Sequence, residues 1–150
     1  MKQRLEYYGI APDLFEPLVA LEKALGKSSL PKALIELVKI RASQINGCAH
    51  CLDMHLRDAR AGGIAEQKLD VLAGFHESPI FDARERAALA WTEALTEVSQ
   101  RGAPQEIYAQ LEELFSDRER VDLTLAICAI NSWNRVAIAF RTVHPVRASG

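Results

Sequence analysis

The chain has 150 residues, of which 49% are hydrophobic and 25% charged, and its formal net charge at pH 7 is −2. This length predicts one domain, residues 1–150, that can bury a sufficient core without stabilising disulfides or metal ions. Acidic and basic residues are interspersed, which excludes the basic stripe of a nucleic-acid-binding protein, so we expect no nucleic-acid partner.

The N-terminal stretch, MKQRLEYYGIAPDLF, lacks the apolar run of a signal peptide. The longest nearly uncharged apolar stretch, Leu123 to Asn134, is too short to span a bilayer. We therefore expect a cytoplasmic protein without a membrane partner. A reducing compartment disfavours a purely structural disulfide, and three cysteines cannot all pair within one chain. The cysteines are then expected either to be reduced thiols that become oxidised as part of the protein's activity, or to be metal ligands.

Helical periodicity dominates the chain, and no segment has a clear strand pattern. The first helix is predicted from about Pro12 to Leu25, with Gly26 in the left-handed position after its end. A second helix begins near Pro31, because proline suits the first helical turn, and it ends at Asn46-Gly47.

Further helices are marked by glycine, proline and capping residues. Asp82 and Glu85 form a capping-box-like pair, and Ser116 or Asp117 caps the last helix. The remaining predicted helices cover about residues 48–62, 66–73, 83–101, 104–115 and 118–141. The sequence therefore predicts one all-α domain of about six or seven helices.

The last predicted helix is apolar over most of its circumference between Val121 and Phe140. Such a helix must be buried on nearly all sides. A subunit interface, and hence a homo-oligomer, is favoured over a central helix wrapped by its neighbours. Asn131, Asn134 and Arg135 interrupt the apolar surface, and they need partners on another helix or chain, or else line an active-site mouth.

Several other residues are given ordinary structural roles. Cys128 is expected to pack as a small hydrophobe. His76 and His144 are expected at the surface, and Trp91 and Trp133 are expected to anchor the core or an interface.

The stretch INGCAHCLDMH, residues 45–55, contains two of the three cysteines and two of the four histidines. On a helix, Cys48, Cys51 and His55 fall within about 60° of one another. Residues three or four apart have Cβ atoms about 5–6 Å apart, which is close to what a disulfide requires. The N–H groups of a first helical turn and a nearby imidazole both favour the reactive thiolate. His50 points away from the cysteines on an ideal helix.

The favoured interpretation of this stretch is redox chemistry, and four alternatives compete with it. Cys48, Cys51 and His55 could share a zinc ion, but no second ligand pair follows. A c-type haem site needs histidine directly after the second cysteine, where Leu52 stands, and a thioredoxin-like site needs a βαβ unit. The cysteines could also simply pack in a core.

A longer pattern includes this stretch and resembles the signature of the alkylhydroperoxidase D-like proteins of the carboxymuconolactone decarboxylase superfamily. Its fixed positions are Glu36, Cys48, His50, Cys51 and His55. The resemblance implies an all-helical fold that assembles as trimers or hexamers. It implies a cysteine pair that reduces a hydroperoxide and becomes a disulfide, with electrons from a dithiol such as a lipoyl group on a partner protein. No metal, haem or flavin cofactor is implied.

The resemblance also implies roles for the five residues. Cys51 would attack the peroxide, and Cys48 would resolve the resulting sulfenic acid. His55 and His50 would move protons, and Glu36 would orient or recharge a histidine.

On a helical wheel of the second predicted helix, Glu36 lies nearly opposite the apolar centre, which by itself predicts an exposed glutamate. If Leu37 and Ile40 define a second buried face, Glu36 can instead point into a cleft or an interface. A proton relay requires that it come within hydrogen-bond reach of the site.

The resulting prediction is a thiol-dependent peroxidase acting on alkyl hydroperoxides. A general dithiol–disulfide oxidoreductase or redox sensor is the alternative, since it would use the same residues. A zinc-binding module is less favoured. A lactone decarboxylase of the wider superfamily is also less favoured, because that branch does not use the cysteine pair.

Overall fold

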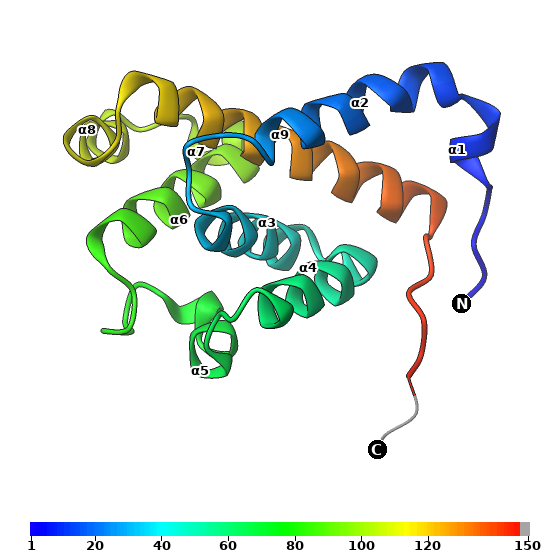
Figure 1. Ribbon diagram of the computed structural model, residues 1–150, viewed down its shortest axis with the longest axis horizontal. Helices are drawn as coiled ribbons and strands as arrows, with labels where there is room; N and C mark the ends of the chain where they lie inside the picture. Colours follow the sequence, from blue (N-terminus) through cyan, green and yellow to red (C-terminus); the bar gives the residue numbers. More distant parts are fainter. Residues whose placement is uncertain (148–150) are drawn as a thin grey trace.

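The computed structural model describes residues 1–147. Within this range every regular element is helical, which confirms the predicted all-α class (Figure 1). The elements are α1 (Tyr7–Ile10), α2 (Pro12–Leu25), α3 (Lys32–Asn46), α4 (Ala49–Ala61), α5 (Glu66–Asp70), a 3₁₀ turn (Leu72–Gly74), α6 (Ala83–Thr96), α7 (Val98–Arg101), α8 (Gln105–Leu114) and α9 (Asp117–Phe140).

Helix α3 lies at the centre of the domain and packs against α4, α6 and α9 (Figure 1). It is buried on almost every side. Leu34, Ile35 and Val38 join one core cluster with residues of α6, α8 and α9. Leu37 and Ile40 join another with residues of α4, α5 and α6, so the second buried face of this helix is confirmed.

Most predicted boundaries agree with the structure, and the exceptions have local causes. The capping boxes Asp82–Glu85 and Ser116–Glu119 both form. Gly26 was predicted to be left-handed and this is wrong: its φ is −63°, because the chain continues in right-handed turns at the end of α2. The helix predicted over 83–101 breaks at Glu97, where neither proline nor glycine signals a break. The short α1 was not predicted.

Helix α9 is the apolar helix for which a subunit interface was favoured over a central position among its neighbouring helices. By length and composition it could cross a membrane, and 44% of its most apolar window is buried inside the protein. It packs against α2, α3, α4, α6 and α8, as expected of a central helix. Cys128 was predicted to be packed, but it is exposed, because it shares the outer face of α9 with Leu125 while Ile127 and Ala129 face the core.

Asn131 and Asn134 of α9 find partners on other helices, as predicted, whereas Arg135 donates its hydrogen bonds to Asn131 of its own helix. The Asn46 amide donates hydrogen bonds to the side-chain oxygens of Asn131 and Asn134, both at 2.9 Å. The Asn134 amide donates to the Ser43 hydroxyl at 3.0 Å. These bonds, which we call the amide clasp, fasten the end of α3 to α9.

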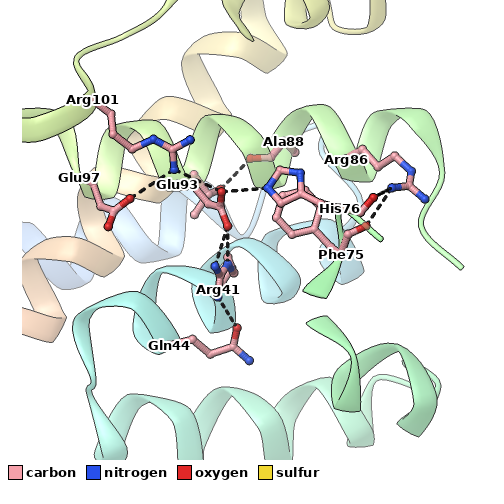
Figure 2. A network of polar contacts seen from close by, with 10 residues as sticks. Arg41, Gln44, Phe75, His76, Arg86, Ala88, Glu93, Glu97 and Arg101 are labelled. Carbon is pink, nitrogen blue, oxygen red and sulfur yellow. Dashed lines mark hydrogen bonds and ion pairs between the residues drawn. The ribbon is translucent and has the colours of Figure 1, made fainter. Parts of the chain in front are cut away.

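Glu93 of α6 is the centre of an ionic network that ties α6 to α3 (Figure 2). Its carboxylate accepts hydrogen bonds from Arg41 at 2.6 and 3.0 Å, from His76 at 3.1 Å and from Arg101 at 3.3 Å. Burial raises the pKa of Glu93, but the hydrogen bonds from His76 and Arg41 outweigh it and hold the pKa below its ordinary value of 4.5. His76 is at the surface, as predicted, and also serves this network.

Replacing Glu93 with glutamine is expected to lower the free energy of unfolding near neutral pH by about 3 kcal/mol, because Arg41 loses a buried partner. Since the pKa of Glu93 is lowered on folding, this contribution is present above about pH 4.5 and is lost as the pH falls through the folded value. Urea unfolding at neutral pH and at about pH 3 should therefore give a smaller difference between wild type and variant at the lower pH. Glu97→Gln, which removes only the half-buried second partner of Arg101, is the control. A difference that does not change with pH would contradict this account.

Candidate active site

The turn between α3 and α4 positions the two cysteines. Gly47 adopts the left-handed conformation with φ 70°, which glycine tolerates without strain. The Cys48 N–H then bonds to the Ser43 carbonyl at 3.0 Å and closes the end of α3. Cys48 becomes the N-cap of α4, and its sulfur accepts a hydrogen bond from the Cys51 N–H at 3.3 Å. The motif therefore sits at the start of a helix, where N–H groups favour a sulfur anion.

Cys48 and Cys51 are joined by a disulfide, with Sγ atoms 2.18 Å and Cα atoms 5.3 Å apart. Both residues are buried, with exposed fractions of 1% and 2%. They pack with Ala42, Ile130 and Ala137 between α3, α4 and α9. The predicted proximity of the two sulfurs is confirmed. The third cysteine, Cys128, lies on the exposed face of α9.

Glu36 and His55 form a pair beside the cysteines. Glu36 Oε2 lies 2.9 Å from His55 Nδ1, and the glutamate side chain is 24% exposed while the histidine is buried. A carboxylate on Nδ1 fixes the ring and leaves Nε2 as the nitrogen available for proton transfer. Glu36 is thus not the exposed glutamate that the wheel alone predicts, because Leu37 and Ile40 give α3 a second buried face and the Glu36 side chain reaches His55.

Cys51 and His55 line a cavity of about 330 Å³. Its apolar wall is formed by Met54, Ile130, Trp133 and Ala137, and its remaining polar lining by Tyr7, Glu22, Lys39 and His50. An apolar cavity with a few converging polar groups is the usual form of a small-molecule site.

Cys48 lines a different hollow, of about 290 Å³, together with Gly47 and Arg141. His50 lines both spaces, and its Nδ1 is buried without a hydrogen-bond partner in residues 1–147. The ideal-helix expectation that His50 points away from the cysteines is therefore too simple, because α4 begins only at Ala49 and the two hollows flank its first turn.

Lys39 and Glu22 are the site residues that the sequence analysis missed. Lys39 Nζ lies 2.5 Å from Glu22 Oε2, and Lys39 is 7% exposed. The available signal was the position of Lys39, one helical turn after Glu36 on the same helix. Glu22 comes from α2, and no sequence pattern connects it to α4. Among residues 1–147 no three His, Cys, Asp or Glu side chains are grouped as a metal site would require.

A cysteine pair at the start of a helix, a glutamate–histidine pair beside it and an all-helical frame define an alkylhydroperoxidase D-like protein. The chain belongs to the carboxymuconolactone decarboxylase family, whose sequence model matches residues 12–94.

The chain is also similar to individual proteins in sequence and in structure. The uncharacterized protein YdfG of Bacillus subtilis is 42% identical over 139 residues, which cover 93% of this chain and 95% of that protein. ATU0492 of Agrobacterium tumefaciens, a protein of unknown function described provisionally as the antioxidant defence protein AhpD, superposes with a TM-score of 0.94 at 43% identity over 97% of this chain and all of that one. An uncharacterized peroxidase-related protein from Silicibacter sp. superposes with a TM-score of 0.78 at 26% identity over 91% of this chain and 72% of that one.

Proposed function

We propose that this protein is a thiol-dependent peroxidase that reduces alkyl hydroperoxides. The observation that carries the proposal is the Cys48–Cys51 disulfide, whose Cys51 end shares a cavity with a histidine held by Glu36. Two cysteines that can join, beside an acid–base group and a space for a small molecule, are the parts that thiol peroxide chemistry requires.

In the proposed cycle, His55 takes the proton from the Cys51 thiol, and the thiolate attacks the outer oxygen of the hydroperoxide. A sulfur–oxygen bond forms, the oxygen–oxygen bond breaks, and an alcohol leaves after gaining a proton. Cys48 then attacks the Cys51 sulfenic acid, which releases water and forms the disulfide. Cys51 is favoured as the attacking residue because it shares the cavity with His55, whereas Cys48 lines the other hollow. His50 borders both spaces and is assigned to proton transfer between them.

The reductant in this proposal is a dithiol, such as a lipoyl group on a partner protein. One of its thiols attacks the disulfide, and its second thiol releases the reduced enzyme by forming a disulfide within the reductant. We further infer a cytoplasmic homo-oligomer, a trimer or hexamer. Exposed apolar side chains on α9, among them Val121, Leu125 and Ile138, support such an assembly.

A general dithiol–disulfide oxidoreductase is the second candidate, and the burial of the disulfide bears on it. A protein-sized substrate must reach a sulfur directly, yet Cys48 and Cys51 are both almost fully buried. A small peroxide fits this arrangement better than a folded protein does.

Mass spectrometry of the reduced protein, before and after one equivalent of cumene hydroperoxide, tests the proposed function. We expect a loss of two daltons that maps to a peptide joining Cys48 and Cys51, with peroxide consumed much faster than free dithiothreitol consumes it. Disulfide formation at a rate no better than that of the free thiol would favour the general oxidoreductase instead.

A further inference from the structure

The cavity that contains Cys51 holds a second acid–base pair, formed by Lys39 of α3 and Glu22 of α2. Lysine is almost never fully buried unless it is paired, and Lys39 is 7% exposed with its ammonium 2.5 Å from the Glu22 carboxylate. A buried ion pair is weak evidence for a contribution to stability, because desolvation opposes it. The position of this pair in the cavity wall suggests a chemical role.

Helix α3 connects the two pairs. Glu36, which holds His55, and Lys39 are three residues apart and therefore neighbours on the helix surface. Both also line a smaller hollow of about 200 Å³ together with Glu22. An ammonium group has three N–H donors, and among the described residues Glu22 is the single hydrogen-bond partner of Lys39 Nζ. Donors on Lys39 therefore remain for a molecule inside the cavity.

Attack on a peroxide needs two proton-handling groups on opposite sides of the reacting oxygen. The sulfur approaches in line with the oxygen–oxygen bond, so the leaving oxygen lies on the side away from the sulfur. His55 follows Cys51 by one turn of α4 and is therefore next to the sulfur. Lys39 belongs to a different helix and borders the same cavity, which suits it to the leaving oxygen.

We propose that Lys39, held by Glu22, is a further catalytic residue that protonates the leaving oxygen of the hydroperoxide; this inference rests on the proposed peroxidase function. The Cys51 thiol gives its proton to His55, and the thiolate takes the outer oxygen and becomes a sulfenic acid. The oxygen–oxygen bond breaks, and the alkoxide takes a proton from the Lys39 ammonium and leaves as an alcohol. Lys39, now a neutral amine, regains a proton from the His55 imidazolium, which restores both groups.

The same geometry indicates the substrate class. The apolar wall around Trp133 and Met54 suits the organic part of a hydroperoxide. Glu22 already neutralises the charge on Lys39, so the cavity offers no unpaired cation to a carboxylate-bearing substrate. An uncharged organic hydroperoxide matches both the apolar wall and the charge-neutral Lys39–Glu22 pair.

The test compares two oxidants whose leaving groups differ in basicity. The alkoxide that leaves cumene hydroperoxide requires a proton, whereas the acetate that leaves peracetic acid does not. In stopped-flow measurements of thiol loss, Lys39→Met is expected to slow the reaction with cumene hydroperoxide by about 100-fold, and the reaction with peracetic acid by less than about threefold. Lys39→Arg keeps the cation, but a guanidinium does not give up its proton, so this variant should also slow the cumene hydroperoxide reaction and leave the peracetic acid reaction unchanged. Lys23→Met is the matched control, because Lys23 is an exposed lysine on α2 that lines neither the cavity nor the smaller hollow.

A second readout separates proton donation from an effect on the thiol. The pH dependence of Cys51 alkylation by iodoacetamide should be unchanged in Lys39→Met. Equal losses with both oxidants, a shifted alkylation profile or an unchanged rate with cumene hydroperoxide would each overturn the role of Lys39. If Lys39→Met fails to fold, Lys39→Arg with a slowed cumene hydroperoxide reaction and an unchanged peracetic acid reaction supports the proposal, and equal slowing overturns it. A wild-type protein no faster than free thiol would instead overturn the proposed function, and this inference with it.

Discussion

Replacing Cys51 with serine is expected to lower the rate of peroxide reduction by about 1,000-fold or more, because it removes the sulfur that we propose attacks the peroxide. Continuous peroxide consumption with a dithiol reductant measures the effect. Cys128→Ser is the control: it removes the exposed third cysteine, which lies outside the motif, and it should react like the wild type.

Cys48→Ser makes this first prediction specific to one sulfur. Without Cys48 no internal disulfide can form, so Cys51 should react once and remain as a sulfenic acid that dimedone traps. Both variants lack the disulfide, so any general effect of losing it is the same in each. A dimedone adduct on Cys48 of the Cys51→Ser protein, with none on Cys51 of the Cys48→Ser protein, would reverse the assignment.

The second large effect is expected from Glu36→Gln, which should lower the rate of thiol oxidation by about 100-fold. Glutamine keeps the size of the side chain but removes the charge that stabilises the His55 imidazolium. It can also present an N–H group to Nδ1 and so favour the wrong tautomer. The rate of peroxide-driven thiol loss, measured from about pH 5 to pH 9, should fall and lose its dependence on the histidine.

Glu113→Gln is the matched control for this measurement, since Glu113 is an exposed glutamate on α8, away from the cavity. Glu36→Gln with a rate within about threefold of wild type would show that the 2.9 Å contact with His55 is structural rather than catalytic.

How much could be predicted from the sequence depended on whether the signal was local. The helix from Pro12 to Leu25, the capping box of Asp82 and Glu85, a cap at Ser116 and the turn at Gly47 follow from neighbouring residues, and the structure contains all of them. The break at Glu97 has no such signal, and it was missed. Cys128 was misplaced because helical periodicity does not say which face of an apolar helix is covered.

The site divides in the same way. Cys48, Cys51 and His55 are near in sequence, so their proximity could be predicted from helical geometry. The pairing of Glu36 with His55 depended on how α3 is buried, and only a resemblance suggested it. Lys39 with Glu22 joins residues 17 positions apart on two helices, a tertiary contact that no periodic pattern encodes.

The amide clasp has a consequence for the proposed redox cycle. Asn46, Asn131 and Asn134 hold the chain immediately before Cys48, and none of their bonds involves sulfur. The disulfide closes a loop of only a few residues, so opening it frees little chain entropy. In the proposed cycle, reduction and reoxidation then need only rotations of the two cysteine side chains while the amide clasp keeps α3 and α9 joined, so neither step has to loosen the fold and expose the chain to proteolysis or aggregation.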